Sequence, residues 1–355
     1  MTIRQGIGDD IGVGIVGSGF MGRTWAAVAD GLPGARVAAV AGGRRAPGLA
    51  AEFGARLHAG VPELLADPDV AVVVLASPPA VHREQAVAAA RAGRHLLVEK
   101  PMAQTPDECA AMVAACSAAG VRLAVVSQQR YRTIPAAAKR LIDEGAIGRV
   151  TMVRAIGPEV GFWDTAVTRD EWKLDPRQQT AFASWGAHAC DLLRWFTGAE
   201  AEVVFALFGA YAPDPPPLRS AMVTYGLTGG AMAQLWMSYD VPRPGLGSGL
   251  QFHVTGTEGM LELDAYGALR LGRGEGWTEA ARQPAFDAAD PRDPVRLGAY
   301  SAQLADLLDA VAAGRDPHVT GRDGLLTTAM LHGAERSAQL GASVRLRNDS
   351  VSASW

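Results

Sequence analysis

The sequence predicts an α/β protein of two domains, and three observations lead to this prediction. The chain has 355 residues, more than one ordinary domain of roughly 100 to 200 residues contains. Its first third alternates short apolar runs with helical patterns, as in a parallel sheet that helices cover on both faces. Its second half contains strand-like runs joined by glycine-containing turns, as in an antiparallel sheet. We therefore expect one domain over residues 1–126 and a second over residues 127–355.

Composition and charge exclude several classes of protein. With 48% hydrophobic and 20% charged residues, the chain is expected to fold rather than to be disordered. Lys and Arg number 33 against 37 Asp and Glu, a net charge of -4 without a long basic run, so no nucleic-acid partner is expected. The three cysteines have no metal-site spacing, which predicts reduced thiols and no metal. No signal peptide and no apolar run of about 18 residues is visible, so we expect a cytoplasmic protein without a membrane partner.

A glycine-rich turn connects the first apolar strand, residues 13–16, to a helix. Gly17 permits a tight turn, Gly19 lets a pyrophosphate approach the backbone, and Gly22 lets the helix pack closely on the strand. The spacing predicts a dinucleotide at the helix N-terminus, where backbone N–H groups face the phosphates. The predicted contact residues are Gly17, Ser18, Gly19, Phe20, Met21 and Gly22.

The second strand, residues 37–41, is followed by Gly42, Gly43, Arg44 and Arg45. An acidic residue normally stands here to bind the ribose hydroxyls of NAD. Without that carboxylate, the two guanidinium groups suit a 2′-phosphate, which mildly favours NADP. The alternative is a solvated loop that accepts NAD equally well.

Two later strands bring further polar residues to the same sheet edge. The run 71–76 leads into Ser77 and Pro78, with His82 in the first turn of the next helix. The strand 95–98 leads into Glu99 and Lys100. Loops at the carboxyl ends of parallel strands surround the ligand crevice, so both are expected to contact the dinucleotide. A threonine-capped helix from residue 105 and a strand over 122–126 complete this domain.

Together, the glycine-rich turn, Ser-Pro-x-x-x-His at 77–82 and Glu-Lys-Pro at 99–101 resemble the glucose-fructose oxidoreductase/inositol dehydrogenase (Gfo/Idh/MocA) family. The resemblance extends through 129–131, 141–148 and His188-x-x-Asp191, and so covers most of the chain. It implies a Rossmann domain that binds NAD or NADP. It also implies a C-terminal α+β domain whose open, largely antiparallel sheet has helices on one face and an oligomerisation surface on the other, hence a homo-oligomer, a dimer or tetramer. Lys100 would contact the reacting oxygen, and Glu99 would lie near the nicotinamide ribose.

The stretch 151–179 is long, aromatic and polar, and we interpret it as a functional loop. Its indoles and carboxylates suit a sugar ring, whereas the alternative is a surface loop with tryptophans in the core. Trp172-Lys173 resembles a Trp-Arg pair that reaches the nicotinamide in some relatives, although lysine replaces arginine here. The candidate substrate residues are Arg130, Glu159, Trp163, Trp172, Asp175, Ser184 and Asp191, with Trp172 and Lys173 also assigned to the cofactor.

A helix over 182–197 carries His188, and oxidation of a secondary alcohol needs a base to take the hydroxyl proton. Histidine suits this role because its ordinary pKa of roughly 6.5 lies near working pH. We assign His188 as the base and Lys100 as its electrostatic partner, with the reverse as an alternative. The family often has aspartate four residues before this histidine, and Ser184 stands there instead. Serine cannot support an imidazolium as aspartate does.

The sequence thus predicts an NAD(P)-dependent oxidoreductase acting on a secondary alcohol or ketone of a sugar, cyclitol or (amino)glycoside. Two alternatives are a dinucleotide-sensing regulator without turnover and a glycosidase that oxidises its substrate transiently. The remaining residues are expected to be structural. We expect strands over 203–208, 222–225, 231–239, 252–256, 260–263 and 344–346, and helices over 300–313 and 325–340.

Overall fold

The computed structural model describes residues 10–160, 183–209, 220–242, 245–246, 249–287, 290 and 292–346. The chain divides into two compact units. The first comprises Met1–Gln128 and Phe286–Leu325, and the second comprises Gln129–Ala285 and Leu326–Trp355. Among the described helices, none combines the length and apolar character needed to cross a membrane.

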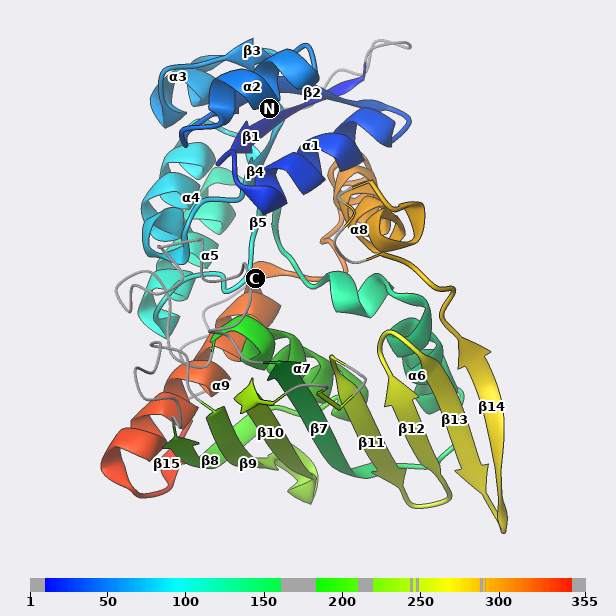
Figure 1. Ribbon diagram of the computed structural model, residues 1–355. Helices are drawn as coiled ribbons and strands as arrows, with labels where there is room; N and C mark the ends of the chain where they lie inside the picture. The colour runs from blue at the N-terminus through cyan, green and yellow to red at the C-terminus, as the bar shows by residue number, and fades with distance from the viewer. Residues whose placement is uncertain are drawn as a thin grey trace. The chain divides into compact units, whose positions relative to one another are not determined.

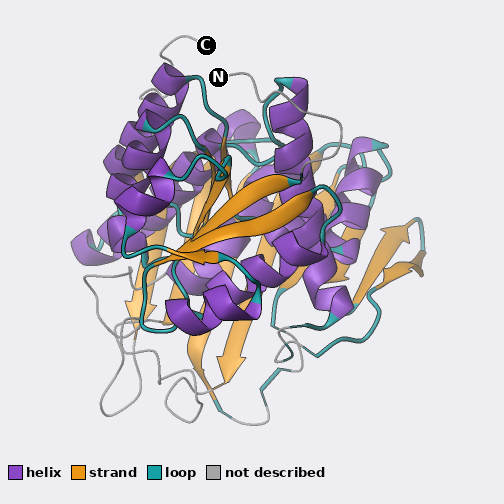
Figure 2. Cartoon of the chain, turned by 90° about the horizontal axis from the view of Figure 1, so that it is seen from above, coloured by secondary structure: helices purple, strands orange, loops and turns teal. Residues whose placement is uncertain are grey.

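The first unit contains a six-stranded parallel sheet with the strand order β3-β2-β1-β4-β5-β6, which confirms the expected Rossmann fold. Its central strands are wholly buried because helices cover both faces, so their sequences are continuous apolar runs (Figures 1 and 2). The strands are β1 (Ile11–Val16), β2 (Ala35–Ala41), β3 (Arg56–Leu57), β4 (Val72–Leu75), β5 (His95–Val98) and β6 (Leu123–Val125). The helices between them are α1 (Phe20–Gly31), α2 (Ala46–Glu52), α3 (Val61–Ala66), α4 (His82–Arg91) and α5 (Pro106–Ala119).

Local signals place α5 where the sequence predicts it. The Thr105 side chain accepts a hydrogen bond from the Glu108 N–H, and the Glu108 side chain accepts one from the Thr105 N–H. This capping box satisfies backbone donors that the first helical turn leaves free. The helix ends at Gly120, whose φ of +67° is the left-handed conformation that glycine adopts without strain.

A helix from late in the chain, α8 (Pro294–Ala313), also belongs to the first unit. Its residues Tyr300 and Leu304 join the apolar cluster around Trp25. Gln303 accepts a hydrogen bond from the Ser127 N–H at 3.2 Å and donates to the Val125 carbonyl at 2.8 Å. The expected continuous domain over 127–355 therefore differs from the structure. The chain leaves the second unit at residue 286 because the apolar face of α8 is buried against the parallel sheet of the first unit.

The second unit is built on a nine-stranded sheet in the order β14-β13-β12-β11-β7-β10-β9-β8-β15. All neighbouring strands are antiparallel except β7 and β10, which confirms the largely antiparallel sheet (Figure 1). The strands are β7 (Val150–Val160), β8 (Ala201–Gly209), β9 (Ser220–Leu227), β10 (Met232–Val241), β11 (Gln251–Gly256), β12 (Met260–Asp264), β13 (Ala268–Arg273), β14 (Gly276–Arg282) and β15 (Val344–Arg345). The other helices are α6 (Thr133–Asp143), α7 (Ala183–Thr197) and α9 (Gly321–Leu340), whose first turn falls in the first unit.

The two faces of this sheet have different environments. One face is buried in an apolar core with residues of α6, α7 and α9, for example Ile134, Phe196 and Met330. The strand register places a row of exposed apolar side chains on the other face. These residues are Met152, Phe205, Leu207, Met222, Met232 and Met260. The expected loop over 151–179 was in part wrong, because its first ten residues lie in β7.

Candidate functional site

The glycine-rich turn has the geometry that its spacing predicts. Gly17 has φ +101°, and a Cβ there would lie 2.6 Å from the Ala76 carbonyl oxygen. A Cβ on Gly22 would lie 1.9 Å from the Gly17 carbonyl oxygen. Among the described residues, nothing lies within 4 Å of a Cβ built on Gly19, which precedes the N-terminus of α1. Gly17 and Gly22 thus have no room for a side chain, whereas the space beside Gly19 is open. A pyrophosphate could approach the backbone there, at the N-terminus of α1.

The turn after β2 lies directly against the glycine-rich turn. A Cβ on Gly43, which has φ +85°, would lie 2.4 Å from the Ser18 hydroxyl oxygen. That oxygen accepts a hydrogen bond from the Arg45 backbone N–H at 3.2 Å. The side chains of Arg44 and Arg45 are exposed, and neither forms an ion pair with another described residue. Two guanidinium groups are therefore accessible at the carboxyl end of β2.

His82 supports the loop that follows β4. The imidazole is fully buried, with Nε2 at 2.8 Å from the Ser77 carbonyl oxygen and Nδ1 at 3.1 Å from the Met102 carbonyl oxygen. Burial lowers the pKa of His82, and the two carbonyl contacts oppose this shift. The Ser77 hydroxyl donates to the Gln85 side chain at 2.5 Å. Both ring nitrogens of His82 thus contact backbone carbonyls and hold Ser77 and Pro78 at the sheet edge of the glycine-rich turn.

Glu99 and Lys100 follow β5 at this same edge. Glu99 Oε1 accepts a hydrogen bond from the Trp25 indole N–H at 2.8 Å, and Oε2 accepts one from the Lys100 backbone N–H at 3.1 Å. Glu99 is 6% exposed, and Lys100 is half-buried. Burial raises the pKa of the Glu99 carboxyl group, whereas the Trp25 N–H, the Lys100 charge and the Lys100 backbone N–H lower it. The Lys100–Pro101 peptide bond is cis.

In the second unit, α7 carries the predicted base. His188 is 7% exposed, and its ring lies edge-on to the Trp185 indole, with 5.9 Å between the ring centroids. Ser184 lies in the first turn of α7, one helical turn before His188. The side chain of Ser184 lies outside the described residues, as does that of Glu159, although Glu159 itself lies in β7.

Arg130 and Asp191 form a buried ion pair. Arg130 Nε donates to Asp191 Oδ2 at 2.8 Å, and Nη2 donates to Oδ1 at 2.6 Å. Their side chains are 9% and 7% exposed, and the guanidinium carbon lies 5.6 Å from the centre of the Trp195 ring. Two parallel charge-assisted hydrogen bonds of this kind fix both side chains. The structure thus brings together two predicted substrate residues as a pair that connects residue 130 to the middle of α7.

A second polar cluster of this unit was missed by the sequence analysis. Gln129 Nε2 donates to the Tyr266 hydroxyl at 2.6 Å, and the Arg132 guanidinium lies 5.0 Å from the centre of the Tyr266 ring. Burial raises the pKa of Tyr266. The ring of Tyr266 lies edge-on to Trp185 at 6.4 Å, so the cluster reaches the neighbour of His188. No sequence signal links Gln129 with Tyr266, which lies 137 residues away.

The remaining predicted site residues lie outside the described residues. They are Trp163, Trp172, Lys173 and Asp175.

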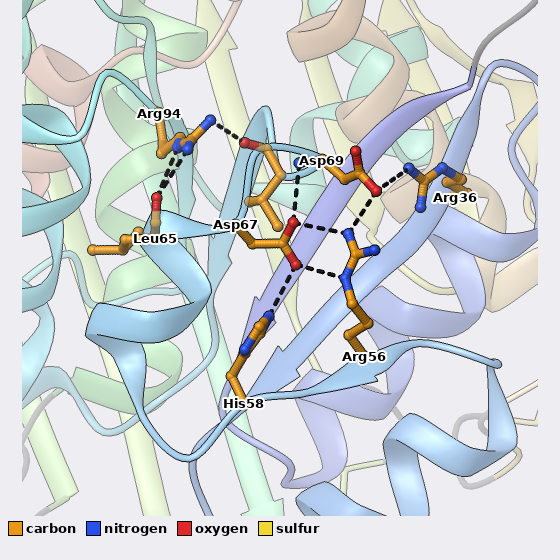
Figure 3. A network of polar contacts seen from close by, with 8 residues as sticks. Arg36, Arg56, His58, Leu65, Asp67, Asp69 and Arg94 are labelled. Atoms are coloured by element: carbon orange, nitrogen blue, oxygen red, sulfur yellow. Dashed lines mark hydrogen bonds and ion pairs between the residues drawn. The ribbon is translucent and has the colours of Figure 1, made fainter.

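A network of charged side chains lies in the first unit, between the edge strand β3 and the turn before β4 (Figure 3). Asp67 accepts hydrogen bonds from Arg56 at 2.7 and 2.8 Å and from the Asp69 backbone N–H at 3.0 Å, and its Oδ2 lies 2.9 Å from His58 Nε2. Arg56 also donates to Asp69 at 2.6 Å. Although burial raises the pKa of Asp67, the bonds from His58 and Arg56 lower it to about 2. The network precedes the amino end of β4, whereas the glycine-rich turn follows the carboxyl end of β1.

Comparison with known proteins agrees with this arrangement. Residues 11–127 match the oxidoreductase family with an NAD-binding Rossmann fold, and residues 136–262 match the GFO/IDH/MocA C-terminal domain. Levoglucosan dehydrogenase of Pseudarthrobacter phenanthrenivorans is 32% identical over 58% of this chain and 56% of its own length. The 1,5-anhydro-D-fructose reductase of Ensifer adhaerens is 29% identical over 76% of this chain and 78% of its own length. The crystal structure of GenD2 from gentamicin A biosynthesis in complex with NAD superposes with a TM-score of 0.80, at 29% identity over 96% of this chain and 97% of GenD2.

Proposed function

Because the chain belongs to the Gfo/Idh/MocA family, we propose that it is an NAD(P)-dependent oxidoreductase that exchanges a hydride with a secondary alcohol or ketone of a sugar, cyclitol or (amino)glycoside. The observation that carries the proposal is in the first unit. There, a glycine-rich turn that fits a dinucleotide shares its sheet edge with a half-buried lysine next to a buried glutamate. The alignment with levoglucosan dehydrogenase covers about half of that enzyme, so its substrate serves here only as a guide to the class.

The two assigned catalytic residues, Lys100 and His188, divide the proton chemistry between them. A bound nicotinamide supplies the hydride donor or acceptor. As the carbonyl forms, His188 takes the hydroxyl proton, and Lys100 stabilises the charge that develops on the same oxygen. In the reducing direction, His188 returns that proton to the oxygen, and Lys100 again stabilises the charge there. Ser184 places a hydroxyl one turn before His188, so the imidazolium has no carboxylate at that position.

The substrate residues divide into a scaffold and a loop. Arg130 and Asp191 act as a pair that fixes α7, because two charge-assisted hydrogen bonds join their side chains. Glu159, Trp163, Trp172, Asp175 and Ser184 are proposed to contact the sugar, through stacking of the indoles and hydrogen bonds that the carboxylates accept from sugar hydroxyl groups. The acidic members of this set suit a cationic aminosugar, and the likeness to GenD2 supports an aminoglycoside as one member of the class.

The proposed cofactor contacts lie in four loops of the first unit, which follow β1, β2, β4 and β5, and in one stretch of the second. The glycine-rich turn holds the pyrophosphate, and the loop braced by His82 borders the nicotinamide half together with Glu99. Lys173 is assigned to the nicotinamide with Trp172. Arg44 and Arg45 are placed to bind a 2′-phosphate, so we propose a preference for NADP over NAD.

We further propose a cytoplasmic homo-oligomer, a dimer or tetramer. The three cysteines are buried and form no disulfide in the part of the chain that the structure describes, as suits a reducing compartment. The exposed apolar row on the second sheet is an unusual surface for a monomer and suits a second copy of the chain. Leu207→Lys, at an exposed position of this row, is expected to lower the molar mass that light scattering measures.

The proposed activity is tested by reduced-nicotinamide absorbance after the protein is mixed with NAD or NADP and a panel of cyclitols, pyranosides and aminoglycosides. Lys100→Met should abolish the signal, whereas Lys139→Met should retain it, because Lys139 pairs with Asp143 on the surface of α6. Cofactor binding without turnover of any panel member would contradict the proposal. Equal loss in the two lysine variants would contradict the role of Lys100.

A further inference from the structure

The Glu99 carboxyl group joins two parts of the first unit that are distant in sequence. One oxygen is bonded to Trp25, 74 residues earlier in α1, and the other is bonded to the backbone of Lys100. Helix α1 begins at the glycine-rich turn, and Lys100 lies two residues after the end of β5. A single carboxyl group thus connects the helix at the proposed phosphate site to the proposed catalytic lysine.

The Trp25 indole has little freedom to turn away from Glu99. It is fully buried in the apolar cluster of the parallel sheet, together with Val13, Val72 and Leu97. Tyr300 of α8 packs edge-on against it, with ring centroids 5.2 Å apart at an interplanar angle of 84°. Because the ring is fixed by packing on several sides, its N–H direction is fixed as well.

The choice of acceptor distinguishes this contact from ordinary satisfaction of a buried indole. A backbone carbonyl would satisfy the Trp25 N–H equally well. Here the acceptor is a buried carboxyl group, whose ionised form needs donors because burial disfavours its charge. Without the indole N–H, Glu99 would either take up a proton or move. Each response changes the charge or the position of the carboxyl group next to Lys100.

We propose that Trp25 is the positioning residue for Lys100: its N–H holds the Glu99 carboxyl group against the Lys100 backbone, and thereby couples the dinucleotide-binding helix to the reacting lysine. This inference rests on the proposed function for the role of Lys100. The coupling of Trp25 to Lys100 through Glu99 is present in the protein without substrate, so it can be tested there.

Trp25→Phe tests the coupling because it removes the N–H and retains an aromatic ring against Tyr300. Hydrogen bonds to charged groups contribute about 1.5–3 kcal/mol, so kcat is expected to fall roughly tenfold to a hundredfold, with the KM for the dinucleotide within about twofold of wild type. The loss should be smaller in a Glu99→Gln background, because the Gln amide oxygen still accepts from the indole N–H but carries no charge for it to stabilise. Trp277→Phe, on the exposed strand β14, is the matched control and should leave kcat unchanged.

A second readout needs no substrate. The chain has only three lysines, Lys100, Lys139 and Lys173, so ¹³C-labelled lysine gives a short set of NMR signals. Trp25→Phe should displace the Lys100 resonance and its titration midpoint, whereas Lys139 on α6 should keep both. If Trp25→Phe does not fold, Glu99→Gln should displace the same Lys100 signal.

The outcomes separate this inference from the proposed function. An unchanged Lys100 signal in folded Trp25→Phe would overturn the coupling, even if the protein proves to be a dehydrogenase. A displaced Lys100 signal in a protein that oxidises no sugar would retain the coupling and remove the proposed function. Equal loss of kcat in the wild-type and Glu99→Gln backgrounds would show that Trp25 acts only through packing, and would also overturn the inference.

Discussion

Removing the carboxylate of Asp191 should destabilise the second unit by an amount that the geometry allows us to estimate. Two charge-assisted hydrogen bonds of 2.8 and 2.6 Å join Asp191 to Arg130, and both side chains are less than a tenth exposed. At about 1.5–3 kcal/mol for each bond to a charged group, Asp191→Leu should cost about 3–5 kcal/mol, the range measured when one partner of a buried pair is removed. The variant Arg130→Met should cost a similar amount.

The double variant distinguishes pairing from packing. In Arg130→Met/Asp191→Leu, neither member of the pair is left without the other, so much of the lost stability should return. Breaking an exposed pair of the same type, Arg282 with Glu279 on β14, provides the control, because exposed pairs contribute about 0–1 kcal/mol. Glu279→Leu should therefore have a small effect.

Hydrogen exchange of α7 amides, followed by mass spectrometry, is the assay of choice because it reports on the second unit alone. A loss of about 3–5 kcal/mol corresponds to roughly a 100- to 4000-fold faster exchange of the protected amides, since 1.4 kcal/mol is tenfold. The reasoning would be refuted if Asp191→Leu exchanged no faster than Glu279→Leu. It would also fail if the double variant were as unstable as the sum of the single ones.

Three further predictions concern the other described clusters. Asp67→Asn should lower the stability of the first unit by about 1–2 kcal/mol at pH 7, because the pKa of this carboxyl group falls from 3.8 to about 2 on folding and each unit is worth about 1.4 kcal/mol before screening by water (Figure 3). Since the folded-state pKa is the lower one, this stability is fully present above pH 4 and is lost as the pH falls from about 4 to about 2. Denaturant titrations at several pH values should show the free energy of unfolding of the wild type approaching that of the variant in this range. The control Asp69→Asn, at an exposed carboxylate, should have a smaller effect at pH 7. Gly22→Ala should abolish binding of the dinucleotide, measured by fluorescence titration, because the added Cβ would lie 1.9 Å from the Gly17 carbonyl oxygen. The control Gly31→Ala lies in the same helix, and no described atom lies within 4 Å of its added Cβ, so this variant should bind the dinucleotide normally. Tyr266→Phe removes the acceptor of the Gln129 amide in a buried place and should lower the Tm by several degrees, and an unchanged Tm would argue against a stabilising role for this bond.

The sequence was sufficient where structure depends on neighbours along the chain. The apolar runs predicted β1, β4 and β5 because strands buried on both faces need no alternation. The glycine spacing predicted the turn before α1 because backbone clashes exclude every other residue at Gly17 and Gly22. The Gly22 clash is with the carbonyl of Gly17, five residues away, and the positive φ of Gly17 belongs to the turn itself, although its Cβ clash is with the distant Ala76.

Prediction failed where the cause lies far away in the chain. The return of α8 to the first unit depends on an apolar surface that forms only when α1 has packed on the parallel sheet, and no local pattern links that surface with residues 294–313. The hairpin β13–β14 was not expected, because almost every residue of β14 is exposed and no alternation of apolar and polar residues appears. The Asp67 network was missed for a similar reason: charged residues near loops are usually solvated, and only the folded chain brings Arg56 and His58 to one buried carboxylate.

Buried polar groups fall between these two cases. The helical pattern of α1 places Trp25 in an apolar core, and a buried indole N–H needs an acceptor. The apolar run before Glu99 likewise implies that its carboxyl group leaves the sheet from a buried strand, where a charge needs donors. Each requirement is readable from the sequence, but the sequence does not say that one satisfies the other. A structure therefore adds most to a functional argument where the sequence implies one buried donor and one buried acceptor near the same predicted site. The pairing of Trp25 with Glu99 turns a motif that implied only a catalytic lysine into an account of how that lysine is held.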